Sequence, residues 1–587
     1  MNNNNLFYRG GGMKKPLIIA GRDDGFGERM RAFLNALYIS KRFNLEFGFV
    51  WRDIIDANNV LDDKVMIPYA NLPTKEFLFS KEFIEKYHKS NMTYVYTTPV
   101  FWSLYKKSIN RLLEEPYEYD WGWYSTYDDL SLFFNDVKED EYRQALSLCW
   151  KEIGFSDSVK KVFDQVEEIV KDLGDFIAVH VRAGDGIYLQ SSRDAMYLYR
   201  YKMFPYGFAI DLSFKSLKKR KKVLLFSDDF NLANSLKKYC LDSIDGLNKE
   251  NIFIMSDLVK DLSKYEQIVF EIVLMSKAKE IFASGTTGFA RCASYIGQNS
   301  LINIYQYYST KEQFEVISRY IEINDVHPLQ KSFSYFHLYL LADELKISFE
   351  IKKEFLVKAL ENDPQNTNSK IFLINLLLKH QYYEEANEQL KIYLKNDEFL
   401  HVLLDNHFNP NLPSEIFLNY LKKDILNYPF IAKVALMIFY SFFNKESVIN
   451  KHYQNLRTII LEHFYQVFYE SKKLQPIGAV KIIHNHLSYK LGKAMIENSK
   501  SFLGYIRMPY VLSYIKEMHK QEKLSKDFPL EYYLDYEQAC KEKNSFTYKL
   551  GEVLIKADKN WHKGGYIKLY FDIKNLKKSF SQKRRNG

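Results

Sequence analysis

The segment Ile177-Ala-Val-His-Val-Arg-Ala-Gly-Asp185 decides the fold class, because it reads as a buried strand that runs into a glycine-containing turn. Side chains alternate along a strand, so His180 and Arg182 are expected on the same face, with Asp185 in the turn. An arginine at this position suits a diphosphate, since its planar guanidinium donates charge-assisted hydrogen bonds to phosphate oxygens and stays charged. An Arg182–Asp185 ion pair that only fixes the turn fits the residues equally well.

Strand-like and helical patterns alternate on both sides of this segment. The strand-like runs are Leu17–Ala20, Glu46–Val50, Phe176–Val181, Lys222–Phe226, Asn251–Met255 and Glu280–Ala283. An amphipathic pattern at Arg29–Lys41 follows the first run, and a long helical pattern at Ser156–Leu173 ends at Gly174. This order predicts an α/β fold with two Rossmann-like domains and a ligand at the carboxyl ends of the strands.

Two acidic residues follow the next strand along the chain, in Val223-Leu-Leu-Phe-Ser-Asp-Asp-Phe230. Asp228 and Asp229 stand before a helical pattern, where an acidic side chain ordinarily caps the helix. A metal-binding pair is the less favoured interpretation, because no other carboxylate or histidine is spaced to complete such a site.

A third segment, Glu271 to Arg291, reads as a helix, a strand, a tight SGTTG turn and another helix. Backbone amides and the hydroxyl groups of Thr286 and Thr287 at that helix N-terminus predict an anion site. Serine and threonine also cap helices when no ligand is present, so this signal is only moderately specific.

The first strand leads into Gly21-Arg-Asp-Asp-Gly-Phe-Gly-Glu-Arg-Met30, a glycine-rich turn before a helix. Asp24 is a candidate general base, because a carboxylate can take the proton of an attacking hydroxyl group. Gly25 and Gly27 are candidates for close approach to the donor. The alternative is that Asp23 or Asp24 merely caps the helix.

The order HVRAGD, FSDD, helix and SGTTG turn resembles the fucosyltransferase superfamily, which includes the α1,6-, α1,2- and protein O-fucosyltransferases and the bacterial nodulation fucosyltransferases. The resemblance covers about residues 15 to 300 and is strongest from Val223 to Arg291. It implies a GT-B-like fold, GDP-fucose as the donor, and a reaction that needs no metal ion or other cofactor. A single inverting displacement is the expected mechanism.

The resemblance also implies roles for individual residues. Arg182 matches the arginine that binds the β-phosphate and stabilises the departing GDP, and Asp24 falls on the catalytic carboxylate of a GEGFN-type turn. His180 and Glu271 fall on guanine-contacting positions and Thr287 on a phosphate-contacting serine. The other donor-binding candidates are Asp185, Asp228, Asp229, Thr286, Gly25 and Gly27. Several members have a second arginine where this chain has Ala183, so another nucleotide-sugar stays an alternative donor.

The composition limits the functions that the chain can have. Its 587 residues carry 82 Lys and Arg against 73 Asp and Glu, and the resulting charge of +9 is too mild to indicate a nucleic-acid binder. No apolar run reaches the length of a membrane span. The cysteines lie far apart without CxxC spacing, which favours a reducing, cytoplasmic location. They are Cys149, Cys240, Cys292 and Cys540.

Helical patterns replace the strand signals after about residue 330. The residues from Ala359 to Leu390 resemble one tetratricopeptide-type helical hairpin. Further on, Tyr489-Lys-Leu-Gly and Gly504-Tyr-Ile recur as Tyr548-Lys-Leu-Gly and Gly565-Tyr-Ile. The apolar positions of these YKLG…GYI repeats are most simply core. The sharper interpretation is an interfacial module for a lipid-linked acceptor, with aromatic side chains at headgroup level and cations attracted to anionic lipid.

We therefore predict an α/β GT-B-like protein with an all-α C-terminal region. Its predicted parts are a disordered tail (1–13), an acceptor-side Rossmann-like domain (14–160), a GDP-sugar-binding Rossmann-like domain (161–330), a tetratricopeptide-like repeat (331–400), and a helical region with the YKLG…GYI repeats and a basic tail (401–587). The predicted function is fucose transfer from GDP-fucose to a glycan hydroxyl in bacterial surface polysaccharide or lipooligosaccharide synthesis, at the cytoplasmic membrane face. An inactive helical-repeat scaffold is the alternative from another class.

Overall fold

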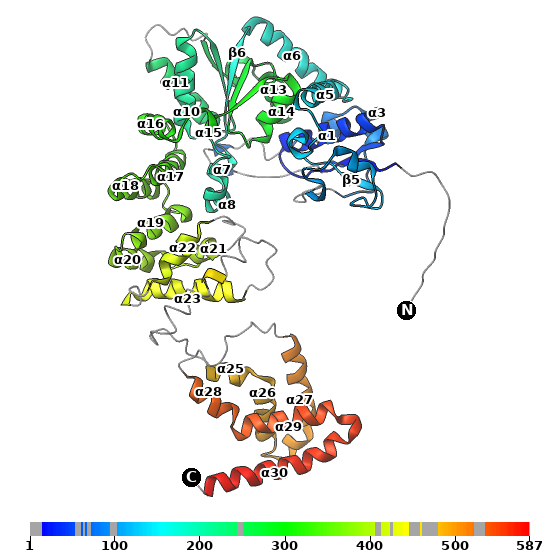
Figure 1. Ribbon diagram of the computed structural model, residues 1–587, viewed down its shortest axis with the longest axis vertical. Coiled ribbons are helices and arrows are strands. Elements are labelled where there is room, and N and C mark those ends of the chain that lie inside the picture. Colours follow the sequence, from blue (N-terminus) through cyan, green and yellow to red (C-terminus); the bar gives the residue numbers. More distant parts are fainter. Residues whose placement is uncertain are drawn as a thin grey trace. The chain divides into compact units, whose positions relative to one another are not determined.

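The computed structural model describes residues 15–52, 60–62, 65–66, 72–93, 102–243, 251–404, 412–422, 427–444, 458–460, 479–521 and 535–585. The chain forms two compact units, residues 1–376 with 401–411 and residues 377–400 with 412–587. Two parallel sheets lie in the first unit (Figure 1). The predicted tail, residues 1–13, lies outside the described residues.

The smaller parallel sheet has the order β2-β1-β5. Its strands are β1 (Leu17–Ala20), β2 (Phe47–Phe49) and β5 (Gly122–Tyr124). Helix α1 (Phe26–Phe43) connects β1 to β2 and is buried on nearly all sides from Phe26 to Ile39, with Arg29, Arg31 and Asn35 among its buried residues. The other described elements of this region are the hairpin β3 (Val60–Asp62) and β4 (Val65–Met66), and the helices α2 (Lys75–Leu78), α3 (Lys81–Tyr87), α4 (Leu130–Phe133) and α5 (Glu139–Lys151).

The larger parallel sheet has the order β10-β9-β6-β7-β8, so that β6 is central. Its strands are β6 (Phe176–Val181), β7 (Lys222–Ser227), β8 (Ile252–Ile254), β9 (Glu280–Ala283) and β10 (Ser300–Asn303). From β6 the chain proceeds through β7 to β8 on one side, and then places β9 and β10 on the other. In such doubly wound sheets, ligands bind beyond the carboxyl ends of the strands where the order reverses, which here is between β6 and β9.

Helices cover both faces of the larger sheet (Figure 1). Helices α10 and α11 lie on one face, and α6, α13 and α14 on the other. The helices from β6 to β10 and their neighbours are α6 (Asp157–Leu173), α7 (Asp185–Tyr188), α8 (Gln190–Asp194), α9 (Met196–Tyr199), α10 (Tyr206–Lys218), α11 (Phe230–Ser243), α12 (Met255–Leu258), α13 (Lys264–Met275), α14 (Gly288–Gly297), α15 (Ile304–Tyr307) and α16 (Thr310–Tyr320).

Local sequence signals account for several of these bounds. Strands β1, β6 and β9 have the predicted limits. Helix α6 begins after Ser156, whose hydroxyl accepts a hydrogen bond from the Val159 amide, and it ends before Gly174, which has a φ of 70°. Strand β10 was not predicted, because its four residues include only two large apolar side chains and show no strong pattern.

All described residues after Asn303 lie in helices and their connections, as predicted for the C-terminal part. The helices that follow α16 are α17 (Pro328–Glu344), α18 (Phe349–Asn362), α19 (Thr367–Lys379), α20 (Tyr383–Tyr393), α21 (Glu398–Leu404), α22 (Ser414–Leu418) and α23 (Pro429–Asn444). Helices α18 to α20 span the predicted hairpin at 359–390, and its tetratricopeptide character stays a prediction. Among the described residues, no helix combines the length and apolar character needed to cross a bilayer.

The YKLG…GYI repeats form a matched pair of helices in the second unit. The described helices of this region are α25 (Ala479–Asn485), α26 (Leu487–Asn498), α27 (Phe502–Gln521), α28 (Tyr536–Lys543), α29 (Phe546–Lys559) and α30 (Gly565–Arg585). A Cβ atom at Gly492 would lie 1.8 Å from the Thr547 carbonyl oxygen, and one at Gly551 would lie 1.7 Å from the Ser488 carbonyl oxygen. Each copy therefore uses its glycine to let the backbones of α26 and α29 touch.

Candidate active site

The Arg182 side chain stands at the carboxyl end of β6, where the strand order reverses. Its Nη2 atom lies 2.9 and 3.1 Å from the two carboxylate oxygens of Asp185. The predicted Arg182–Asp185 ion pair is therefore present. The Arg182 side chain is 20% exposed and that of Asp185 is 33% exposed. An anion from solvent can therefore reach Arg182 and replace Asp185 as its partner.

Asp228 shapes the turn that carries Arg182. One of its carboxylate oxygens accepts hydrogen bonds from the backbone amides of Ala183, at 2.7 Å, and Gly184, at 2.8 Å. Its other oxygen lies 4.0 Å from Nη1 of Arg182. Asp228 thus holds the turn directly, and a contact of its own with the donor stays a prediction.

Asp229 is buried and has the capping role that the sequence also allowed. Its Oδ1 accepts a hydrogen bond from the Leu232 amide in the first turn of α11, at 2.9 Å. Its Oδ2 accepts hydrogen bonds from the hydroxyl of Tyr188, at 2.6 Å, and from the side-chain amide of Gln330, at 3.0 Å. Both oxygens are thus engaged in the protein, and donor contact by Asp229 also stays a prediction.

The His180 ring is buried beneath the same edge of the sheet. It stacks on Phe289, with ring centroids 5.8 Å apart. Burial, together with the nearby charge of Arg182, lowers the pKa of His180 to about 3, so the ring is neutral at physiological pH. Its Nδ1 atom has no hydrogen-bond partner among the described residues, which leaves capacity for a polar ligand.

Glu271 of α13 lines a pocket beyond the ends of β7 and β8. The remaining lining residues are mostly apolar: Leu225, Phe226, Ser227, Phe230, Ala233, Ile254, Met255 and Ser256. Burial raises the pKa of Glu271 to about 8, against a weaker opposing effect of its hydrogen bond from Gln267. The pocket is small, about 10 Å³, which is room for about one water molecule, and Glu271 is the one carboxylate among its lining residues.

The SGTTG turn lies on the other side of the reversal point, between β9 and α14. Thr287 caps α14 by position, and its hydroxyl donates to the Ser284 carbonyl oxygen at 2.7 Å. Thr286 is exposed, and its hydroxyl donates to the Tyr201 carbonyl oxygen at 3.1 Å. Of the two predicted phosphate ligands, Thr286 is therefore the accessible one, and Thr287 shapes the turn.

The first turn of α1 meets the first turn of α14. A Cβ atom at Gly27 would lie 2.4 Å from the backbone of Gly288, and the Glu28 carboxylate lies where a Gly288 Cβ would stand. Gly27 faces backbone atoms, so only glycine at this position permits the approach, whereas a side chain at Gly288 would displace the flexible Glu28 carboxylate. Gly27 therefore joins the two Rossmann-like halves of the site, while Gly25 is the residue that precedes α1 and is exposed.

Asp24 does not cap α1, and its role as a general base stays a prediction. Its Oδ2 accepts hydrogen bonds from the Arg22 guanidinium at 2.5 and 3.2 Å, and its Oδ1 has no hydrogen-bond partner among the described residues. Burial raises its pKa above the ordinary value despite Arg22. Asp23 does not cap α1 either, because its carboxylate pairs with Arg29, at 3.0 Å, and Arg52, at 2.8 Å.

The chain between α9 and α10 connects the turn after β6 with the turn after β9. The Phe204 amide donates to the Arg182 carbonyl oxygen at 3.1 Å, and the Ser284 hydroxyl donates to the Lys202 carbonyl oxygen at 2.8 Å. The turns after β6 and β9 thus lie at one edge of the sheet, and Gly27 brings the start of α1 to the same α14 helix.

Sequence patterns missed residues that support this site from a distance. Arg22 holds Asp24, Phe289 stacks on His180, and Gln330 reaches Asp229 from α17. Arg22 lies in the glycine-rich segment and Phe289 in the segment that contains the SGTTG turn, whereas Gln330 belongs to no motif. Among the described residues, no three His, Cys, Asp or Glu side chains are grouped to hold a metal ion.

Comparisons with known proteins add the following. Residues 419–582 match a family model described as a domain of unknown function (DUF8374), which covers the C-terminal repeats and not the candidate site. No curated protein matches the chain.

Several solved structures resemble part of the chain. They include NodZ α1,6-fucosyltransferase soaked with GDP-fucose (13% identity, 50% of this chain and 96% of that chain, TM-score 0.27), fucosyltransferase NodZ from Bradyrhizobium (14%, 50% and 97%, 0.27) and POFUT1 in complex with GDP (13%, 50% and 99%, 0.26). TM-scores this low carry no argument about the present chain.

The raised pKa of Glu271 predicts how one substitution changes stability with pH. The folded protein keeps this carboxyl neutral until about pH 8, whereas the unfolded chain ionises it near pH 4.5. Its contribution to stability is therefore complete below pH 4.5 and is lost as the pH rises toward 8. We expect Glu271→Gln, which stays neutral, to melt within about 1 °C of the wild type at pH 4.5 and a few degrees higher at pH 8.

Thermal melting from pH 4.5 to 8.5 checks this expectation, with Glu168→Gln on the exposed face of α6 as the control. A gain of equal size in the control, or no gain for Glu271→Gln at pH 8, would contradict it.

Proposed function

We propose that this chain is a GT-B-like glycosyltransferase that transfers fucose from GDP-fucose to a hydroxyl group of a glycan, with inversion at the sugar. The observation that carries the proposal is the position of Arg182, a partly exposed guanidinium at the carboxyl end of β6, beside the point where the strand order reverses. Nucleotide ligands bind at this edge of doubly wound sheets. The order of motifs that resembles fucosyltransferases supports the choice of donor.

The diphosphate of the donor would lie between Arg182 and the SGTTG turn. Arg182 then exchanges its bonds to Asp185 for bonds to phosphate oxygens, and the N-terminus of α14 adds backbone N–H groups and a positive helix end. Both supply positive charge where GDP departs, so the proposed reaction needs no metal ion.

The guanine base would lie at Glu271, at the pocket beyond β7 and β8, which would have to widen to enclose it. An ionised Glu271 can accept two adjacent N–H groups, which guanine presents on one edge and adenine and uracil do not. Apolar side chains line this pocket beside Glu271, whereas His180 does not line it, so its contact with the base stays a prediction. Glu271 must lose its proton to bind in this way, so the proposal includes tighter GDP binding as the pH rises toward 8.

The transfer step uses Asp24 as the general base. Its Oδ1 takes the proton of the acceptor hydroxyl while the acceptor oxygen forms a bond to the sugar C1. The bond from C1 to the β-phosphate oxygen breaks at the same time, and the electron pair leaves with GDP. Arg22 holds Asp24 through Oδ2, and Oδ1 has no hydrogen-bond partner among the described residues but is buried, so the acceptor hydroxyl would have to open a path to it.

Ala183 bears on the identity of the sugar. It is fully buried, and its amide is bonded to Asp228, so this position has no room for a second guanidinium. The phosphate is then bound by Arg182 without a second arginine, and another GDP-sugar is the alternative donor within the same class.

We also propose that the C-terminal repeats dock on an anionic membrane surface that presents a lipid-linked glycan of a surface polysaccharide or lipooligosaccharide. Residues 479–587 contain 22 Lys and Arg but only 11 Asp and Glu, so this region holds the positive surplus of the whole chain. Helix α30 alone carries seven Lys and Arg against one Asp. Each basic residue near an anionic surface adds about 1 kcal/mol of attraction.

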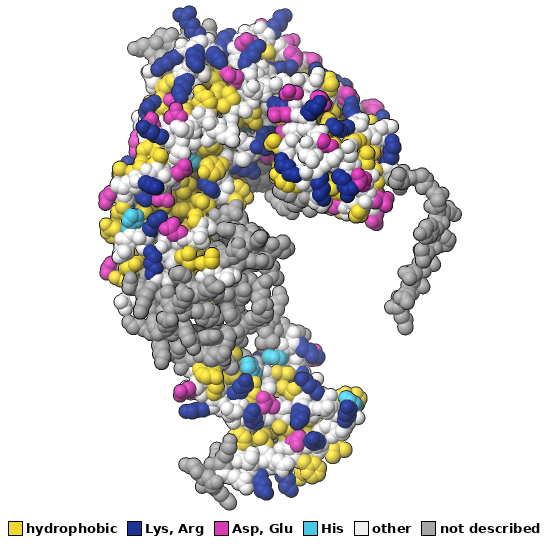
Figure 2. Space-filling view, in the orientation of Figure 1, with side chains coloured by type: hydrophobic (Ala, Val, Ile, Leu, Met, Phe, Trp, Pro, Cys, Tyr) yellow, Lys and Arg dark blue, Asp and Glu magenta, His cyan; other side chains and the backbone are white. Residues whose placement is uncertain are grey.

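Both copies of the repeat expose the same types of apolar residue. Tyr505 and Ile506 are 60% and 56% exposed, and Tyr566 and Ile567 are 52% and 74% exposed. Other exposed large side chains on α27 and α30 are Phe502, Leu503, Tyr510, Tyr514, Tyr570 and Phe571. Figure 2 shows dark blue basic and yellow apolar side chains intermixed on this unit. A lipid surface matches both features, whereas a second copy would oppose like charges.

The donor proposal is tested first at Arg182. We expect Arg182→Ala to weaken GDP binding about ten- to a hundredfold, because a charge-assisted bond to phosphate is lost, and Arg182→Lys to lose less. Isothermal titration calorimetry with GDP measures the effect. Arg111→Ala is the control, since Arg111 is half exposed and pairs only locally with Glu114. Equal GDP affinity in the wild type and Arg182→Ala would refute the assigned role.

The base is tested with Asp24→Asn, which keeps the size and the acceptor oxygen for Arg22. We expect transfer to slow about a hundredfold or more while GDP affinity stays within about twofold of the wild type. Sugar transfer to an acceptor glycan and GDP titration are measured on the same preparation. A variant that retains the wild-type transfer rate would remove Asp24 from the mechanism.

Membrane docking is tested by sedimentation with vesicles of phosphatidylglycerol and phosphatidylcholine. We expect binding to the anionic vesicles that weakens with salt, and a loss of about tenfold or more in the double variant Tyr570→Ser and Phe571→Ser. Tyr105→Ser, at a residue of the first unit that is 46% exposed, is the control. Equal binding to pure phosphatidylcholine, or no binding to either vesicle, would contradict the proposal.

A further inference from the structure

Helix α17, the first helix after the α/β region, contacts the turn that carries Arg182. Gln330 of α17 is 2% exposed, and its side-chain amide donates hydrogen bonds to the Ala183 carbonyl oxygen, at 2.7 Å, and to Oδ2 of Asp229, at 3.0 Å. Ala183 is the residue after Arg182, and Asp229 follows the residue that holds the Arg182 turn. One side chain of α17 therefore contacts both segments that shape the turn.

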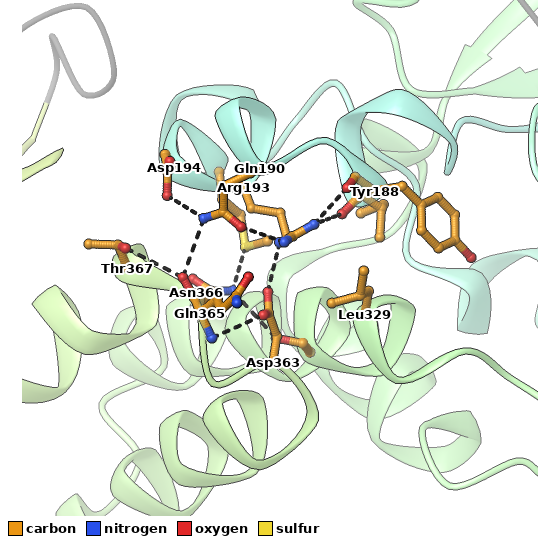
Figure 3. A network of polar contacts seen from close by, with 12 residues as sticks. Tyr188, Gln190, Arg193, Asp194, Leu329, Asp363, Gln365, Asn366 and Thr367 are labelled. Carbon is orange, nitrogen blue, oxygen red and sulfur yellow. Dashed lines mark hydrogen bonds and ion pairs between the residues drawn. The ribbon is translucent and has the colours of Figure 1, made fainter. Parts of the chain in front are cut away.

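A second connection joins the helical region to the chain just beyond this turn. Figure 3 shows α8 facing the loop between α18 and α19, with Arg193 and Asp363 in the centre. The Arg193 Nε and the Asp363 carboxylate lie 3.0 Å apart and are 8% and 3% exposed. The side-chain amide of Asn368 adds hydrogen bonds to the carbonyl oxygens of Arg193 and Asp194, at 2.9 and 2.7 Å.

A third contact lies along the same helix. His337 is two turns beyond Gln330 and shares its face of α17. Its ring centroid lies 5.4 Å from that of Tyr305, whose hydroxyl donates to the Arg200 and Met203 carbonyl oxygens. These carbonyls belong to the segment that ties the Arg182 turn to the SGTTG turn, so α17 supports both turns.

We propose that Gln330 is a positioning residue for Arg182, and that α17 to α19 are an integral part of the donor site. The inference rests on the proposed function. Without Gln330, the buried Ala183 carbonyl and Asp229 carboxylate each lose a donor, and the turn is free to shift. A shift of Arg182 on the order of 1 Å moves its guanidinium out of reach of the β-phosphate. The helical region thus sets the affinity for the donor although Gln330 does not touch it.

The test uses the 587-residue chain with Gln330→Ala and the shape-matched Gln330→Met. We expect each to raise the dissociation constant for GDP about tenfold or more, and the KM for the GDP-sugar in parallel, with kcat changed less. Gln313→Ala is the matched control. Gln313 is also buried and also donates two hydrogen bonds, at 3.2 and 3.0 Å, but to the carbonyls of Tyr305 and Tyr308.

A double-mutant cycle separates positioning from general destabilisation. If Gln330 acts through Arg182, then Gln330→Met adds less than twofold to the loss of GDP affinity in an Arg182→Ala background. Equal losses in both backgrounds, or a Gln313→Ala variant that loses as much as Gln330→Met, would overturn the inference. If Gln330→Met leaves the GDP affinity unchanged, only the positioning role of Gln330 is overturned. If the wild type binds no GDP, the proposed function is overturned as well.

Discussion

One carboxylate oxygen of Asp228 fixes the turn at the carboxyl end of β6 by accepting two successive backbone amides, from Ala183 and Gly184. The Asp228 side chain is only 8% exposed, so these charge-assisted bonds form where water competes little. The conformation of this turn determines where the Arg182 guanidinium lies. Because β6 is the central strand of the larger sheet, this position is also the point from which the strand order runs in both directions. The rest of the candidate site is arranged around it.

Three helices contribute to the candidate site around this turn, and each contributes something different. Helix α14 brings an N-terminus and the exposed hydroxyl of Thr286. Helix α1 reaches α14 through Gly27 and carries Asp24 from the other half of the unit. Helix α17 comes from the helical region and contacts the turn through Gln330. Elements that are distant in the sequence therefore adjoin one another here, with α17 in contact with the Arg182 turn and α1 in contact with α14.

Local patterns were enough to predict some of this arrangement. The apolar run of β6, its glycine turn and the placement of Asp229 before a helix are short-range features, and the structure has them. The role of Asp228 in holding the turn, the pairing of Arg22 with Asp24 and the reach of Gln330 were not predictable in this way. They depend on tertiary packing between segments, and a buried glutamine on a helix has no periodicity or spacing that distinguishes it from a surface glutamine. The YKLG…GYI repeat is visible in the sequence, but the close contact between its two glycine-bearing helices appears only once α26 and α29 are packed.

We propose that this edge of the sheet binds a guanine nucleotide, and the decisive measurement is the thermal stabilisation of the 587-residue chain by a panel of nucleotides. A ligand at one hundred times its dissociation constant stabilises the folded state by about 2.7 kcal/mol. GDP and GDP-fucose are expected to raise the melting temperature, and UDP, ADP and their sugar derivatives are expected to leave it unchanged. Stabilisation by UDP or a UDP-sugar without any response to GDP would contradict the claim.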